Sequence, residues 1–263
     1  MSDPFLIYLL LCLSALAAGA VNSIAGGGTL LSFPPLLKIF NGLENGAVLA
    51  NATSTVALLP GSFAGALGYR KEVIECRKLI LQLLAPSLIG GALGSILVIR
   101  YPGVFAALVP WLILSAAFLF LLQGPIKRLT GAGSHGPPRG RTIAAVVLGQ
   151  FLIAIYGGYF GAGIGILMLS VLPFMGTQTI HQTNAAKTVL AVAMNGVTVL
   201  IFIIEGVVVW PYALAMAAAA ILGGYLGARF ARRLPAIYVR VLVVIIGFGL
   251  GLYYLWKEFG NGS

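Results

Sequence analysis

The chain has 263 residues, of which 60% are hydrophobic and only 8% are charged, and its mean hydropathy is +1.03. A water-soluble protein of this length needs far more polar residues to cover its surface, so the composition excludes a soluble globular domain and indicates an integral membrane protein with several spans. The net charge of +10 does not indicate nucleic-acid binding, because most basic residues lie in loops between apolar runs, as they do where loops face anionic lipid.

Ten apolar segments follow one another along the chain, five in each half. A helix that crosses a bilayer needs about 20 residues, so the second segment of each half is short, and the sequence leaves open whether it crosses completely. A linker rich in Gly, Pro and basic residues separates the halves. In chain order the segments are 5–24, 29–40, 46–69, 79–99 and 104–122, then 143–160, 164–175, 184–204, 212–231 and 237–256.

The second half of the chain repeats the first. With a shift of 133 positions, "GGALGSILVIRYP" (90–102) aligns with "GGYLGARFARRLP" (223–235), which indicates an internal duplication. We therefore predict an all-α membrane protein made of repeat 1 (1–122), a linker (123–142) and repeat 2 (143–263). Other matched positions are Asn51 with Asn184, Thr55 with Thr188 and, at a shift of 138, Gly27 with Gly165.

The basic residues change sides between equivalent loops of the two halves. Loop 70–78 carries basic residues while its counterpart, 203–211, carries none, and the region 229–240 is rich in arginine while its counterpart is not. Because Lys and Arg collect in cytoplasmic loops, we predict that the two repeats lie upside down relative to each other. Loop 70–78, the linker and region 229–240 are then cytoplasmic, and both termini are outside.

Glycines interrupt the first helix of each repeat, at Gly26–Gly28 and at Gly161–Gly165. Non-helical backbone inside a bilayer is tolerated where it is buried in protein or lines a cavity, and a helix N-terminus offers unpaired N–H groups and a positive dipole end to an anion. Both breaks are therefore predicted to form an anion site. The alternative is tight helix packing, which we expect instead for the pairs Gly90/Gly94 and Gly223/Gly227.

Polar side chains share one face of the third segment in each half. Lys187 stands beside them in an apolar segment, where a cation costs about 2.5–3.5 kcal/mol even on the insertion scale. We expect Lys187 to pair with an anion or to gate the site; the alternatives are that it extends to the interface and that the Asn and Thr residues bond between helices. His181 is predicted to be interfacial. The shared faces are Asn184, Thr188 and Asn195 in one half and Asn51, Thr55 and Ser62 in the other.

Catalytic and metal-binding motifs are absent from the sequence. "GGYFGAGIG" lacks the register of a dinucleotide-binding loop, and the six acidic residues lie mostly in loops. Cys12 lies in an apolar run and Cys76 in a basic loop. The sequence has no cluster of Cys or His residues, so neither cysteine indicates a disulfide or a metal site. The sequence therefore predicts neither an enzyme nor a bound cofactor or metal.

Four segments resemble the TauE/SafE sulfite exporter family: "AGGGTLLSFPPLL", "ANATSTVALLPGSFAGALGYR", "GAGIGILMLSVLPFMG" and "TNAAKTVLAV". The resemblance implies a permease of the bacterial inner membrane that moves small anions such as sulfite or organosulfonates, for example sulfoacetate. The substrate-binding residues that we predict are Gly26, Gly27, Gly28, Thr29, Asn51, Gly163, Gly165, Asn184 and Lys187, and the secondary candidates are Asn22, Thr55, Thr188 and Asn195.

The resulting hypothesis is an exporter that works by alternating access, with its anion held where the two breaks converge. An anion channel and a permease for another small organic anion are the alternatives. The expected partners are the small anion and the lipid bilayer, with no nucleic acid. The sequence leaves open which anion is moved, whether a coupling proton or cation drives it, whether a homodimer forms, and whether the repeats rock or one moves as an elevator.

Overall fold

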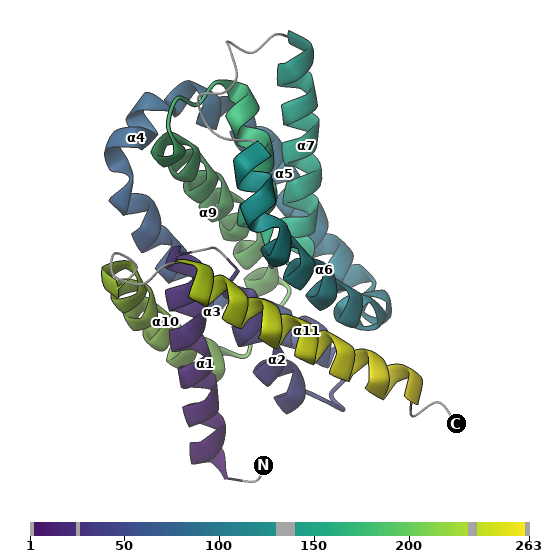
Figure 1. Cartoon of the computed structure of the whole chain (residues 1–263). Helices are drawn as coiled ribbons and strands as arrows, with labels where there is room; N and C mark the ends of the chain where they lie inside the picture. Colours follow the sequence, from purple (N-terminus) through teal and green to yellow (C-terminus); the bar gives the residue numbers. More distant parts are fainter. Residues whose placement is uncertain (1–2, 25–26, 130–139, 231–235, 261–263) are drawn as a thin grey trace.

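The computed structural model describes residues 3–24, 27–129, 140–230 and 236–260. This part of the chain is helical and contains no β-strand (Figure 1). The elements are α1 (Pro4–Ile24), α2 (Thr29–Ile39), α3 (Gly46–Gly68), α4 (Arg70–Glu75), α5 (Arg77–Arg100), α6 (Pro102–Leu129), α7 (Gly140–Tyr159), α8 (Ile164–Val171), the 3-10 helix η1 (Leu172–Met175), α9 (Ile180–Ile204), α10 (Trp210–Phe230) and α11 (Ala236–Gly260).

Within the described residues, 7 helices are long and apolar enough to cross a membrane, namely α1, α3, α5, α6, α7, α9 and α10. The prediction of an all-α integral membrane protein is therefore confirmed. Helix α2 has 11 residues, which at 1.5 Å per residue gives about 16 Å, roughly half of the ~30 Å hydrocarbon core. Helix α8 is shorter still, so neither short helix crosses the bilayer alone.

The two short helices return along the helices that precede them. Helix α2 packs against α1, and α8 packs against α7. The beginning of α1 and the end of α11 lie at one end of the molecule, whereas α7 begins at the opposite end (Figure 1). Each interrupted helix thus forms a hairpin whose turn lies inside the protein.

Packing partners are exchanged between the two halves of the chain. Helix α1 packs against α10 and α7 against α5, while α3 contacts α10 and α9 contacts α5. Helix α3 also contacts α9, and α6 contacts α11. Two copies of one unit related by a two-fold axis would contact each other in this way, although the opposed orientation of the repeats in a bilayer stays a prediction.

Glycines bring the backbones of α5 and α7 into direct contact. A Cβ at Gly90 would lie 2.6 Å from the Phe151 carbonyl oxygen, and Cβ atoms at Gly94 and Gly158 would overlap the facing backbone. Gly223 has the same relation to α1, where a Cβ would overlap the Leu16 carbonyl. The predicted packing role is confirmed for Gly90, Gly94 and Gly223, because side chains there would force the helices apart.

Two local features differ from the simplest expectation. Loop 70–78 contains the short helix α4, which packs against the beginning of α9. Pro34 and Pro35 lie inside α2, which continues beyond them to Ile39. Both cysteines are free thiols, as predicted.

Candidate functional site

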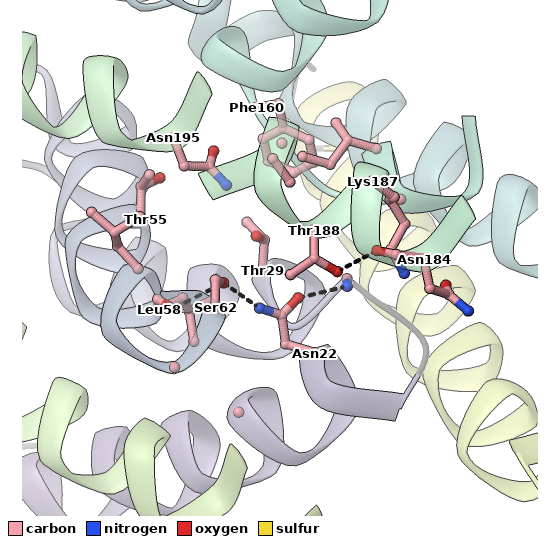
Figure 2. A pocket seen from close by; sticks show the side chains of 18 of the residues that line it. Asn22, Thr29, Thr55, Leu58, Ser62, Phe160, Asn184, Lys187, Thr188 and Asn195 are labelled. Carbon is pink, nitrogen blue, oxygen red and sulfur yellow. Dashed lines mark hydrogen bonds between the residues drawn. The ribbon is translucent and has the colours of Figure 1, made fainter. Parts of the chain in front are cut away.

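The first break connects α1 to α2 through a sharply turned backbone. Gly27 has φ +132°, a conformation that side chains rarely adopt, and a Cβ there would overlap the Phe120 ring. The Asn22 side chain holds this turn, because its Oδ1 accepts a hydrogen bond from the Gly27 N–H (3.2 Å) and its Nδ2 donates one to Ser62 Oγ on α3 (2.9 Å; Figure 2). The Thr29 N–H, in the first turn of α2, has no partner among the described residues.

The second break connects α7 to α8 in a similar way. Gly161 and Gly163 both have positive φ, +81° and +79°, and the Tyr156 hydroxyl donates a hydrogen bond of 2.7 Å to the Ala162 carbonyl. The backbone N–H groups of Ile164 and Gly165, in the first turn of α8, donate no hydrogen bond to any described residue. Both breaks therefore present the positive end of a short helix.

A cavity of about 160 Å³ lies between the two breaks. Both short helices contribute their first residues to its wall, and α1, α3 and α9 supply the remainder. Most of the predicted substrate-binding residues meet here. The cavity is lined by Gly27, Thr29, Gly165, Asn184 and Lys187 from the main set, by all four secondary candidates (Asn22, Thr55, Thr188 and Asn195), and also by Gly19, Ser62, Tyr69 and Phe160.

Polar groups in the lining divide into donors and acceptors. The hydroxyls of Thr55 and Thr188 donate to carbonyls one turn earlier in their own helices, at 2.8 and 2.7 Å, so their oxygens face the cavity as acceptors. Asn184 and Asn195 also line the cavity, and each carries a side-chain amide that can donate hydrogen bonds. Lys187 adds a positive charge, and none of the described Asp and Glu residues lines the cavity, so the field inside it favours an anion.

Figure 2 shows how these groups are distributed. Lys187 and Asn184 lie at one end of the view, Thr55 and Asn195 lie at the other, and Thr29 lies between them. A small molecule in this space would meet the cation at one end and neutral polar groups at the other. Bonds between helices were one alternative for the Thr side chains. Thr55 and Thr188 instead bond within their own helices.

Three of the predicted residues that the structure describes do not line the cavity. Gly28 packs against α1, where a Cβ would overlap the Ala18 carbonyl, and a Cβ at Gly163 would face Leu119 of α6 at 3.5 Å. Asn51 is only 1% exposed and donates from Nδ2 to the Tyr159 carbonyl at 3.1 Å. Gly26 lies outside the described residues. His181 lies in the first turn of α9 and is exposed.

Sequence reasoning did not single out the aromatic residues of the lining. Tyr69 ends α3 and Phe160 follows α7, and neither stands out in a chain with 10 tyrosines and 14 phenylalanines. Ser62 was placed on the polar face with Thr55 by the sequence, but it was not among the predicted site residues. A signal for Phe160 was its place directly before the second glycine break.

A helical membrane protein with a polar cavity between two interrupted helices has the construction of a membrane transporter. The family described as "Sulfite exporter TauE/SafE" matches residues 11–254. The chain therefore belongs to the TauE/SafE family.

Bacterial relatives cover nearly all of the chain. It is 27% identical to a "Probable membrane transporter protein" of Haemophilus influenzae, over 92% of each chain. It is 29% identical to the "Probable membrane transporter protein ORF9" of a Sinorhizobium species, over 95% of this chain and 93% of the relative. Identity to the Escherichia coli "Probable membrane transporter protein YfcA" is 26%, over 99% and 94%. No solved structure matches the chain significantly.

Proposed function

We propose that this transporter moves small anions such as sulfite or organosulfonates across the bacterial inner membrane by alternating access. The observation that carries the proposal is the cavity, where the starts of α2 and α8 meet Lys187 and where the described lining contains no carboxylate. Unpaired N–H groups of helix starts and a nearby cation are the groups that bind oxyanions in proteins.

The size of the cavity supports a small substrate. A volume of about 160 Å³ corresponds to on the order of ten water molecules, at roughly 10–15 Å³ each for this kind of volume. Sulfite occupies part of that space, and an organosulfonate with two or three carbons fills more of it. In the second case the sulfonate group would pair with Lys187, and the other end of the molecule would reach Thr55 and Asn195.

The position of the cavity indicates the side of the membrane that it faces. Its wall uses the end of α3, up to Tyr69, and the N-terminal part of α9. Gln182, near the start of α9, donates a hydrogen bond to Glu75 of α4 (2.8 Å), so the cavity lies on the α4 side. With loop 70–78 in the cytoplasm, as proposed from the positive-inside rule, this is an inward-facing state, with the chain termini outside.

The test is anion uptake by proteoliposomes that contain the purified protein. Radiolabelled sulfite and sulfoacetate are the probes, and Lys187→Met removes the charge of the cavity while it keeps most of the side-chain volume. We expect flux to fall at least about tenfold, because an anion in a poorly solvated site then lacks its counter-charge. The matched control is Lys38→Met, which alters an exposed lysine at the end of α2 and should leave flux unchanged.

A channel is distinguished by its response to voltage and concentration. The transporter hypothesis requires flux that saturates with substrate and shows no unitary currents in planar bilayers. Unchanged flux in Lys187→Met would exclude the assigned role of that residue. Unitary currents would contradict the transporter hypothesis and show that the same cavity belongs to an open pore.

A further inference from the structure

The side of the protein opposite the cavity is sealed by aromatic rings. Phe33 of α2, Phe105 of α6 and Phe160 are each at most 2% exposed. The Phe160 ring packs edge-on against Phe33, with centroids 5.3 Å apart, and Phe105 packs edge-on against Tyr159, also at 5.3 Å. Phe160 lines the cavity as well. Its ring therefore belongs both to the cavity wall and to this cluster of rings, which we call the aromatic seal.

The seal lies toward the end of the molecule that carries the chain termini. Helix α5 has 24 residues and runs about 36 Å away from α4, and α6, with Phe105 in its first turn, begins where α5 ends. Helix α3 begins at the same end, with Asn51 in its second turn. The seal therefore closes the route from the cavity toward the side away from α4.

Asn51 is built into this closed side with half of its hydrogen-bonding capacity unused. Its Nδ2 donates to the Tyr159 carbonyl, directly before Phe160. Its Oδ1 is buried, and no described residue donates to it. A buried amide oxygen without a donor is unfavourable and rare in folded proteins, so this atom points to a second arrangement in which it has a partner.

The internal repeat identifies that arrangement. Asn51 and Asn184 occupy equivalent positions of the two repeats, and Ser54 is equivalent to Lys187 by the same shift. On the α9 side both residues are half-buried and line the cavity, whereas on the α3 side Asn51 and Ser54 are 1% and 0% exposed. At these two equivalent positions the α9 residues are open to the substrate space and the α3 residues are sealed, although Thr55 and Ser62, further along α3, do line the cavity.

We infer that Asn51 is a substrate-positioning residue of the opposite state, in which the aromatic seal opens and the Asn51 amide faces the substrate as the Asn184 amide does here. This inference rests on the proposed transport function. In that state the hydrogen bond from Asn51 to the Tyr159 carbonyl is broken, and the amide is free to bond the substrate. The Phe160 ring then leaves Phe33 and Phe105.

The first experiment separates transport from stability. Asn51→Leu removes the amide and its unpaired oxygen. Gln150→Leu is the matched control, because Gln150 of α7 is also fully buried with an unpaired amide oxygen, but its amide nitrogen, Nε2, donates to Ser87 Oγ of α5 (2.9 Å) and not to a residue of the seal. Both variants are assayed for sulfite and sulfoacetate flux in proteoliposomes and for thermal unfolding in detergent. We expect Asn51→Leu to keep its unfolding temperature within a few degrees but lose about tenfold or more in flux, as expected for a group that acts in only one state.

The second experiment reads the opening without any substrate. In a background where Cys12 and Cys76 are replaced by alanine, Ser54→Cys places a thiol behind the seal, and a membrane-impermeant maleimide is added on the side of the chain termini. We expect slow labelling, which Phe105→Ala accelerates about tenfold or more by removing the central ring.

The outcomes separate the two hypotheses. A parent protein without flux of either probe contradicts the proposed function, whereas the labelling result still reports whether the seal opens. Parent flux with equal flux in Asn51→Leu overturns the role of Asn51. Loss of flux in Gln150→Leu to the same degree does so too, because the effect would then be structural. Labelling of Ser54→Cys that is indifferent to Phe105→Ala shows that this cluster is not the seal.

Discussion

The contact between α5 and α7 gives a sharp test of the packing that holds the second hairpin. In Gly90→Ala, the new Cβ would lie 2.6 Å from the Phe151 carbonyl oxygen, 2.7 Å from the Ala154 Cβ and 3.0 Å from the Ile155 N. Ordinary contact begins at 3.4 Å, so the backbones must separate by roughly 0.8 Å. Because Ala154 and the backbone atoms cannot rotate away, the strain falls on the helix pair.

The expected cost follows from two opposed terms. Overpacking of this kind destabilises a protein by about 1–3 kcal/mol, and lost contacts along the separated helices add to it. Replacement of glycine by alanine inside a helix restores at most about 1 kcal/mol. We therefore expect Gly90→Ala to lower the free energy of unfolding by about 1–2 kcal/mol.

The assay is reversible unfolding of the purified protein in mixed micelles, followed by circular dichroism. Gly196→Ala is the control, because Gly196 lies within α9 and a Cβ there meets nothing within 4 Å. That variant should be as stable as the parent or up to about 1 kcal/mol more stable, through helix propensity alone. If Gly90→Ala equalled Gly196→Ala in stability, the close backbone contact between α5 and α7 would be refuted.

Three further predictions concern other parts of the chain. Asn22→Leu removes the bridge between α3 and the first break, and should cost about 1–3 kcal/mol of stability together with most of the flux, measured by unfolding and uptake. The pKa of the Cys76 thiol is raised by burial and by the nearby charges of Glu75 and Glu72. The pH at which Cys76 alkylation accelerates should therefore be higher in the folded protein than in the unfolded chain, and Glu75→Gln should lower it. Identical pH profiles of alkylation for the folded and unfolded protein would contradict this. Lys71→Cys should react with an impermeant maleimide only from the cytoplasm and Glu205→Cys only from outside; labelling from one common side would reject the inverted repeats.

Much of the fold follows from the hydropathy pattern and the glycines. All ten apolar segments coincide with helices, because few residue types other than apolar ones are tolerated across a bilayer. The two breaks were predictable because several glycines together weaken a helix that nothing else interrupts. The short helix α4 was not predicted, since its six residues are too few and too charged to produce an apolar period.

The sequence predicted that the glycine breaks and the polar helix faces form the candidate site. It did not predict which of their residues line the cavity. Asn51 and Asn184 are indistinguishable in the repeat pattern, yet one is sealed and the other lines the cavity. This difference depends on which of two arrangements the chain adopts, and that is a property of the packing of all the helices. Gly28 and Gly163 belong to the breaks but do not line the cavity: Gly28 packs directly against the backbone of α1, and Gly163 supplies a positive φ (+79°) before α8.

The two halves are unequal in the chemistry that they bring to the substrate. Lys187 has Ser54 as its counterpart, and Phe160 has Asn22 at the shift of 138, so the cation and the Phe160 ring each come from one repeat only. An anion that crosses a poorly solvated space needs a counter-charge throughout, and Lys187 is the one cation among the described residues of the lining. We therefore expect Lys187 to stay with the substrate in both states, while the neutral groups around it, Asn184 in one state and Asn51 in the other, are exchanged.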